Sequence, residues 1–209
     1  MKTLASILFL ILVTGSENQA QHISLGVRLS YLPSYSQEFS QIFPKSDYRG
    51  FNLVGGDLLY NFDVPIPISA GVSVSIGRKI LMDYHPSSPQ PPGTGPTDMS
   101  RRIELFLVEF PVLYRVYFLP DLSLRAGVRV GHVAFKRYDH LLGRDFEMLA
   151  NRIILTPQMD LGIDLPFPVR LAVGAEYRPM DIVLSQTPSS DVTYTLKGVW
   201  YCGSLAYAF

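Results

Sequence analysis

The stretch IPISAGVSVSIG, Ile66 to Gly77, alternates apolar residues with polar or small ones along its whole length. Its apolar members are Ile66, Ile68, Ala70, Val72, Val74 and Ile76, and only Pro, Ser and Gly stand between them. Successive side chains of a β-strand point to opposite faces, so this alternation predicts a strand with one apolar face.

The same alternation recurs before and after this stretch and predicts eight strands in an all-β chain. They cover residues 22–31, 51–62, 66–77, 106–116, 122–131, 152–164, 169–178 and 198–209. The second segment alternates least cleanly. Its adjacent glycines, Gly55 and Gly56, are typical of a bulge, which would change the side chains that face outward.

The connections between these segments alternate between short and long. Short turns rich in proline and aspartate lie at residues 63–65, 119–121 and 165–167, whereas longer polar stretches cover residues 32–50, 78–102, 136–151 and 179–192. This alternation is typical of an eight-stranded, antiparallel, up-and-down transmembrane β-barrel with short periplasmic turns and four extracellular loops. A closed barrel leaves no unpaired edge, so we expect residues 198–209 to pair with residues 22–31.

Charged side chains occupy only one face of the predicted strands. The apolar faces carry no Asp, Glu, Lys or Arg, and the opposite faces carry a predicted lumen charge network of Arg28, Glu109, Arg115, Arg125, Arg129, Asp160, Asp164, Arg170 and Glu176. A secreted lipocalin-like barrel or a β-sandwich would show the same alternation with its apolar face inward. The apolar faces are too extensive for the narrow interior of an eight-stranded barrel, which favours lipid on the outside.

Aromatic side chains near the strand ends fit the same interpretation, because aromatic girdles mark membrane interfaces. They are Tyr31, Tyr60, Tyr114, Tyr117, Phe118, Tyr177, Tyr207 and Phe209. Inside the barrel, the hairpin at residues 165–167 makes Asp164 and Arg170 cross-strand neighbours, and Glu109 lies diagonally from Arg129. Such pairs indicate a core of structural ion pairs, with a ligand or proton pathway as the alternative.

The first residues predict export from the cytoplasm. Lys2, the apolar run Leu4–Val13 and the small residue Ala20 are typical of a signal peptide over residues 1–20, with an uncleaved anchor helix as the alternative. The single domain then covers residues 21–209. Basic and acidic residues number 18 each, so no net charge directs the chain to nucleic acid.

The segment LFLVEFPVLYRVYF, Leu105 to Phe118, resembles the fourth-strand signature of PorT-like or OmpA-like outer-membrane β-barrel proteins of Gram-negative bacteria. The final residues Gly203, Leu205, Tyr207 and Phe209 are similar to the terminal assembly signal of such barrels. The resemblance implies insertion into the outer membrane by the barrel-assembly machinery. It does not imply the secretion role of PorT, because the fold alone does not determine function.

A lipid deacylase or acyltransferase is the enzymatic alternative, since such an enzyme needs a serine beside a histidine base. His22 and Ser24 have a suitable spacing, but they lie at the extreme end of the first strand, where capping the strand is the simpler role. His85 and His140 lack metal-ligand spacing, and the chain contains no dinucleotide or phosphate-loop motif. We therefore expect no catalytic, metal or cofactor site.

The expected function is that of a non-enzymatic outer-membrane protein whose lumen is closed by polar side chains. Its role would be structural or would lie in surface contacts through the loops, of which residues 85–98 form a proline-rich, solvated stretch. The partners expected are outer-membrane lipid, the assembly machinery and an unknown surface or periplasmic protein. We expect a monomer.

Overall fold

A computed structural model describes residues 23–39, 46–62, 67–84, 99–141, 144–185 and 191–209 of the chain. Ten β-segments make up this part: β1 (Ile23–Phe39), β2 (Ser46–Phe62), β3 (Ile68–Tyr84), β4 (Met99–Leu119), β5 (Leu122–Leu141), β6 (Arg144–Asp164), β7 (Val169–Arg178), β8 (Asp181–Ser185), β9 (Asp191–Thr195) and β10 (Gly198–Ala208). The predicted signal peptide and the turn at residues 63–65 lie outside the described residues. Among the described residues, no helix is long and apolar enough to cross a membrane.

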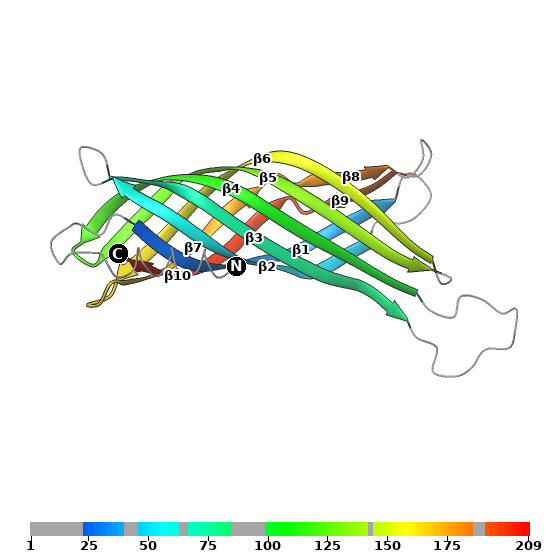
Figure 1. Cartoon of the computed structure of the whole chain (residues 1–209), viewed down its shortest axis with the longest axis horizontal. Helices are drawn as coiled ribbons and strands as arrows, with labels where there is room; N and C mark the ends of the chain where they lie inside the picture. The colour runs from blue at the N-terminus through cyan, green and yellow to red at the C-terminus, as the bar shows by residue number, and fades with distance from the viewer. Residues whose placement is uncertain (1–22, 40–45, 63–66, 85–98, 142–143, 186–190) are drawn as a thin grey trace, which may run out of the picture.

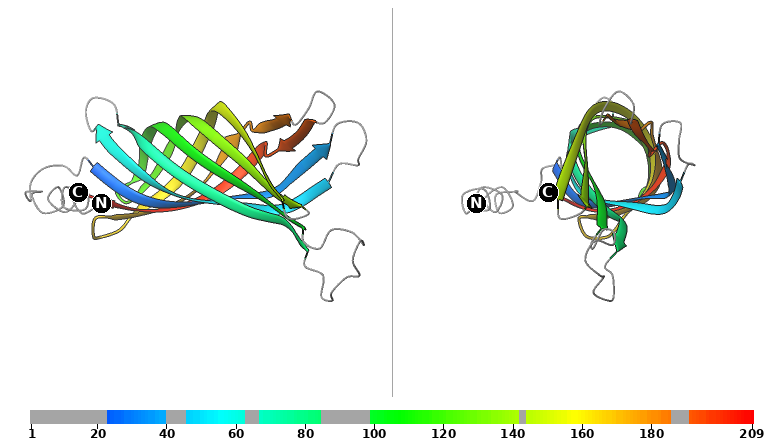
Figure 2. Two further views of the ribbon diagram at one scale, coloured as in Figure 1. Left: turned by 45° about the vertical axis from the view of Figure 1, so that its right-hand side comes forward. Right: turned by 90° about the vertical axis from the view of Figure 1, so that its right-hand side faces the viewer.

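The segments form a closed antiparallel barrel of eight strands, seen end-on in Figure 2. Neighbours in sequence pair from β1 to β7, and β10 pairs with β7 on one side and with β1 on the other. The register of this closure runs from Ser24 opposite Ala208 to Tyr31 opposite Tyr201. The predicted fold class and the predicted pairing of the first and last strands are therefore confirmed.

The seventh and eighth barrel strands are each divided in two near the loop end. β8 follows β7 after Pro179, which has no backbone N–H to donate to a ladder. β9 precedes β10 and pairs with both β8 and β1. At the break, the backbone N–H of Leu196 donates to the carbonyl of Met180 over 2.8 Å, so the two interrupted strands stay joined.

The turns at residues 119–121 and 165–167 are confirmed. Leu119 pairs with Leu122, and the N–H of Leu165 donates to the carbonyl of Val169. Because β1 begins and β10 ends at this level, both ends of the barrel domain lie with the turns, at the end marked C in Figure 1. We call this the turn end and the opposite one the loop end.

The predicted bounds of the four long loops are wrong. β1 continues to Phe39, β3 continues to Tyr84, and β5 and β6 leave only residues 142–143 between them. In most of these extensions the sense of the alternation is opposite, because apolar side chains point inward and polar ones outward, as Leu105 and Glu104 do in β4. A search for apolar outward faces therefore ends each strand too early.

The predicted bulge at Gly55 and Gly56 is also wrong. β2 keeps an unbroken register with β1 and with β3 through both glycines. Gly55 faces the interior, where a β-carbon would lie 2.2 Å from the hydroxyl oxygen of Ser75. The glycine therefore serves close packing inside the barrel, and the outward face of β2 is continuous from Val54 to Phe62.

A real irregularity occurs further along the same pair of strands. Gly50 has a φ of 68°, a left-handed conformation that favours glycine. The register has Phe51 opposite Leu32 before it and Arg49 opposite Ser34 after it, and next to them Tyr35 and Tyr48 pair with their rings stacked at 5.2 Å. The reversal at Gly50 turns Tyr48 toward the interior and exposes Arg49.

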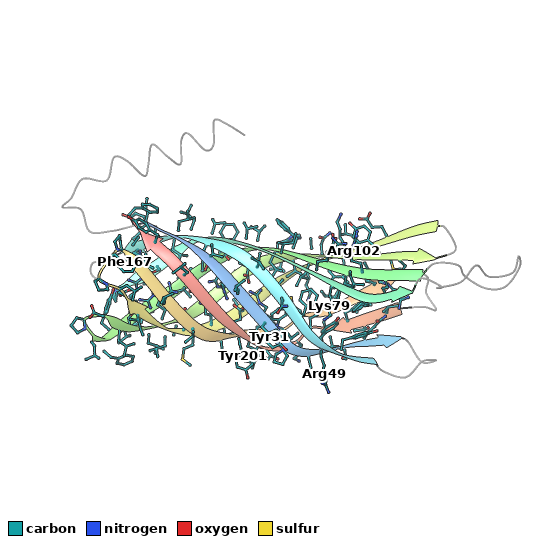
Figure 3. The ribbon with its side chains drawn as sticks, turned by 90° about the horizontal axis from the view of Figure 1, so that it is seen from below. Tyr31, Arg49, Lys79, Arg102, Phe167 and Tyr201 are labelled. Atoms are coloured by element: carbon teal, nitrogen blue, oxygen red, sulfur yellow. The ribbon has the colours of Figure 1, made fainter. Side chains whose placement is uncertain are left out.

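The outer surface carries an apolar belt bounded by aromatic residues. Phe167 lies at the turn end and Tyr31 and Tyr201 lie farther along the barrel (Figure 3), all three exposed. Exposed apolar side chains fill the belt, among them Val27, Leu58, Val74, Phe110, Val130, Leu155, Val173 and Leu205. Basic side chains, including Arg49, Lys79 and Arg102, lie beyond it toward the loop end.

Candidate functional site

The interior of the barrel holds three layers of side chains, and all nine residues of the predicted lumen network are inside it. Arg28, Glu109, Arg125, Arg129, Asp160, Arg170 and Glu176 are buried, and Arg115 and Asp164 are partly buried near the turn end. The alternation of the strands brings them there, because each occupies the inward phase of its strand. The partners they take are decided by the closure of the barrel.

The middle layer joins strands that are not neighbours. Arg178 of β7 donates to both carboxylate oxygens of Glu109 in β4, over 2.8 and 3.1 Å, and its Nε donates to Glu176 over 2.9 Å. Arg28 of β1 contacts the other oxygen of Glu176. The side chains of Arg178, Glu109 and Glu176 are all 0% exposed, so this cluster spans the lumen without water on any of the three.

A second cross-lumen contact lies beside it. Arg129 of β5 donates to Asp57 of β2 over 3.1 and 3.4 Å, and its Nε contacts the side-chain oxygen of Gln158. Gln158 in turn donates to Asp160 over 2.8 Å. Glu109 therefore takes Arg178 as its partner, whereas its diagonal neighbour Arg129 is paired with Asp57.

Sequence reasoning left Asp57, Gln158 and Arg178 out of the network. Arg178 and Gln158 stand in the inward phase of their strands, which was a usable signal for both. Asp57 was obscured by the expected bulge directly before it. The continuous alternation of Leu53, Gly55, Asp57 and Leu59 would have revealed its inward orientation.

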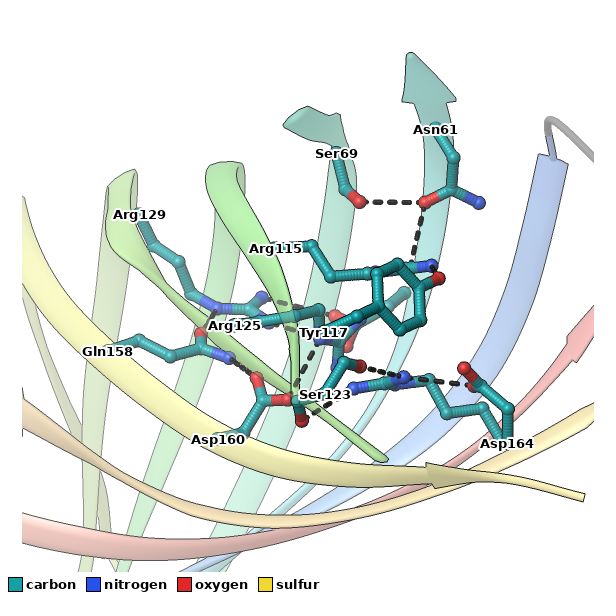
Figure 4. Close-up of polar contacts among 12 residues, drawn as sticks. Asn61, Ser69, Arg115, Tyr117, Ser123, Arg125, Arg129, Gln158, Asp160 and Asp164 are labelled. Atoms are coloured by element: carbon teal, nitrogen blue, oxygen red, sulfur yellow. Dashed lines mark hydrogen bonds and ion pairs between the residues drawn. The ribbon is translucent and has the colours of Figure 1, made fainter. Parts of the chain in front are cut away.

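The layer toward the turn end surrounds a cavity of about 350 Å³. Arg125 pairs with Asp160 over 2.8 Å, and Arg170 donates to Asp164 over 2.9 Å and to the hydroxyl of Ser123 over 2.7 Å (Figure 4). The expected cross-strand pair of Asp164 and Arg170 is present in the register. We call this space the turn-end cavity; Ser24 also lines it, and His22 lies outside the described residues.

The layer toward the loop end is apolar and forms a hydrophobic core cluster of buried residues. Leu32, Phe51, Leu105, Phe135, Tyr194 and Trp200 are buried there, with Phe51 and Trp200 in an edge-to-face contact at 6.0 Å. The lumen is therefore polar only in its turn-end and middle parts. The expectation of a lumen filled by polar side chains alone is corrected, because the strand extensions enclose an apolar plug.

A small ion-pair cluster accompanies this apolar plug. Arg101 and Arg137 both donate to Asp139, from Nε to the same carboxylate oxygen over 2.9 and 3.0 Å. Burial raises the pKa of Asp139. The hydrogen bonds and charges of Arg137 and Arg101 together lower this pKa by more than burial raises it, so it lies below the ordinary value. Burial also raises the pKa of Tyr194, to about 12.

The residues of the predicted assembly signal lie along the outward face of β10. Leu205 stands opposite Val27 and Tyr207 opposite Leu25, and the rings of Tyr207 and Phe209 are 4.7 Å apart. Gly203 stands opposite Leu29, and a β-carbon there would meet nothing within 4 Å. The signal residues therefore belong to the seam at which β10 meets β1.

No group of His, Cys, Asp and Glu side chains among the described residues is arranged to hold a metal ion. Ser24, the serine of the enzymatic alternative, is buried at the rim of the turn-end cavity. In the described part of the chain, the chemistry offered by the interior is consequently that of arginine–carboxylate pairs and of amide and hydroxyl hydrogen bonds.

No protein-family model matches the chain, and no curated protein sequence matches it. Solved structures do share its fold. Neisserial surface protein A is 10% identical, with a TM-score of 0.52 over 90% of this chain and 97% of its own. The outer membrane protein OprG from Pseudomonas aeruginosa is 11% identical, with a TM-score of 0.52 over 91% and 99%. A major outer membrane protein from Thermus thermophilus is 10% identical, with a TM-score of 0.50 over 90% and 99%. The chain therefore has the fold of the outer-membrane β-barrels.

Proposed function

We propose that this chain is an integral outer-membrane β-barrel protein with a closed interior, whose role is structural or lies in surface contacts made by its loop end. The observation that carries the proposal is the reversed polarity of the barrel. Apolar side chains cover its outside between the aromatic residues, while arginine–carboxylate pairs are buried inside. Water on the outside would leave the apolar belt exposed, whereas lipid covers it.

The strand length between the aromatic residues supports a membrane crossing. On β1 the belt runs from Ile23 to Tyr31, and a tilted β-strand crosses the hydrocarbon core with roughly nine to eleven residues. Beyond Tyr31 basic side chains such as Arg49 and Arg102 appear on the outside beside exposed apolar ones such as Ile80 and Val183, while most of the buried inward side chains become apolar.

Closure of the lumen follows from its contents. Ion pairs cross the middle layer from β4 to β7 and from β2 to β5, and the apolar plug fills the layer next to them on the loop-end side. We therefore propose that no continuous aqueous path crosses the barrel. We also propose that the protein is not an enzyme. The protein reconstituted in planar bilayers should give no stepwise conductance, and lipid deacylation by the wild type should equal that of Ser24→Ala.

We propose that the loop end faces the cell exterior and the turn end faces the periplasm. Cysteine labelling tests this orientation directly, because the only cysteine of the chain, Cys202, can first be replaced. In a Cys202→Ser background, Arg102→Cys should react with a membrane-impermeant maleimide on intact cells. Phe167→Cys should react only after the outer membrane is permeabilised. Labelling of Phe167→Cys on intact cells would reverse the orientation, and a purified protein that stays soluble without detergent would remove the membrane assignment.

The proposed partners are outer-membrane lipid, the barrel-assembly machinery and an unidentified surface or periplasmic protein, with the chain as a monomer. The exposed seam residues Leu205 and Tyr207 support recognition of β10 during assembly. Tyr207→Ala should lower the amount of folded protein in cells but refold normally from urea into detergent. This proposal does not include the secretion role of PorT, although the sequence resembles PorT-like proteins.

A further inference from the structure

The turn-end cavity holds more positive than negative charge. Its charged walls are Arg115 of β4, Arg125 of β5, Arg170 of β7 and Asp164 of β6, and Asp160 of β6 pairs with Arg125 behind them. Among the described residues around the cavity, three guanidinium groups therefore share two carboxylates. Figure 4 shows the side chains of Arg115 and Arg125 pointing into the same space.

Two of these arginines stand directly opposite each other. Arg115 and Arg125 are cross-strand partners in the β4–β5 ladder, and both face the interior. Like charges at directly opposed positions destabilise a sheet unless something compensates them. Asp160 compensates Arg125, so within the described ranges the uncompensated charge of the pair belongs to Arg115.

The hydrogen-bond acceptors that the described residues offer to Arg115 are neutral oxygens. Its guanidinium donates to the hydroxyl of Tyr117 over 2.9 Å and to the amide oxygen of Asn61 over 3.2 Å, and Asn61 also accepts from Ser69 over 2.7 Å. Within the described part of the chain, the Nε atoms of Arg115 and Arg170 are buried without a hydrogen-bond acceptor. Buried donors of charged groups left in this state are costly.

Around the cavity, the interior is shaped to hold Arg170. A β-carbon on Gly162 would lie 2.1 Å from an Nη of Arg170, so a larger residue there would displace the guanidinium from its present position. Arg170 reaches Ser123, Asp164 and, at 4.0 Å, Asp160. It is thus held in place by β5 and β6 while the cavity remains open beside it.

We propose that the turn-end cavity binds a phosphate-type oxyanion, with Arg115 as its principal ligand and Arg125 and Arg170 as supporting ones. A tetrahedral phosphate offers several acceptor oxygens to guanidinium groups that approach from three strands, and the planar fork of arginine suits this geometry. The anion neutralises the opposed pair and accepts from donors that the protein leaves unused. This binding site goes beyond the proposed function and does not depend on which compartment the turn end faces.

Two sources supply the same chemistry. One is a soluble phosphate, and the other is the phosphate of a phospholipid headgroup that enters from the belt beside the exposed side chain of Phe167, which lines the cavity. The test must therefore compare a phosphate-free micelle with a phospholipid bilayer.

The experiment follows the arginine Nε–Hε resonances of ¹⁵N-labelled protein in a maltoside detergent. Sodium phosphate should give saturable shifts at Arg115 and Arg170, whereas sodium chloride at equal ionic strength should not. Arg115→Gln should weaken the response of Arg170 at least tenfold. The matched control is Arg102→Gln, which removes an arginine at the loop end and should leave the titration unchanged.

In phospholipid nanodiscs, a headgroup ligand would shift these resonances before any phosphate is added, whereas a soluble ligand would require the addition. Either result supports the site and identifies its source. Identical responses to phosphate and chloride, together with unchanged resonances in nanodiscs, would overturn the proposal. The wild-type titration decides this even if Arg115→Gln does not fold.

Discussion

Glu109→Gln should be among the most destabilising single changes inside this barrel. The substitution keeps the shape of the side chain but removes the negative charge to which Arg178 donates two hydrogen bonds, over 2.8 and 3.1 Å. Both side chains are 0% exposed, so water cannot replace the lost charge. Glu176 remains, but it already serves Arg28 as well as Arg178.

The magnitude follows from burial and distance. Two unit charges about 4 Å apart attract by about 4 kcal/mol at an effective dielectric constant of about 20. Removing one partner of a buried pair typically costs about 3–5 kcal/mol, and release of the buried carboxylate from its desolvation offsets part of the loss. We expect the free energy of unfolding to fall by about 3 kcal/mol, which lowers the urea midpoint by roughly 1–3 M.

The assay is urea unfolding of protein refolded into lipid vesicles. The only tryptophan, Trp200, is buried, and its ring lies 5.6 Å from the guanidinium carbon of Arg178, so its fluorescence reports on this layer. Heat-dependent electrophoretic mobility gives an independent measure of the folded fraction. The control Glu147→Gln removes an exposed partner of Lys136 at 3.1 Å and should resemble the wild type.

A double-mutant cycle separates the pair from its surroundings. Arg178→Gln alone should also destabilise the barrel, and the double variant should lose less than the sum of the two singles, because its middle layer regains charge balance. If Glu109→Gln unfolds within about 0.5 kcal/mol of the wild type, or if the two changes are additive, the buried cluster does not hold the barrel together as described.

Three further changes address the other parts of the molecule. Val108→Arg places a charge on the outward face between Val74 and His132, and should cost about 2–4 kcal/mol if that position lies at the bilayer midplane; a neutral result in vesicle unfolding would mean that lipid does not cover this face. Phe135→Ala leaves a cavity in the apolar plug and should cost about 3–5 kcal/mol in the same assay, whereas an unchanged midpoint would show that the plug is loosely packed. Asp139, whose folded pKa is below its unfolded value, contributes stability that is present above the unfolded pKa and lost as pH falls through the folded one. Hydrogen exchange at the loop end, corrected for the intrinsic pH dependence of amide exchange, should therefore show protection that falls below about pH 4 in the wild type, and this fall should be smaller in Asp139→Asn.

The sequence by itself determined the barrel and the inward phase of its charged residues. Alternation with period two is a local property, so the outward faces of Phe106–Val116 and Val169–Tyr177 could be assigned without knowledge of any neighbour. The pairing of the last strand with the first could also be predicted, because the last apolar strand would otherwise leave the hydrogen-bonding groups of its backbone edge unpaired. The strand ends were misjudged where the sense of the alternation reverses, as it does between Phe106 and Ile103.

Only the tertiary structure decided which side chains meet inside the barrel. Glu109 and Arg178 are 69 residues apart and lie on strands that are not neighbours, so neither spacing nor hairpin register could pair them. The same holds for Arg129 and Asp57. It also holds for the apolar plug, whose residues come from strands spread along the chain from β1 to β10. Strand phase points a side chain inward, but the strand order, the stagger and the narrow diameter of the closed barrel determine what it reaches across the lumen.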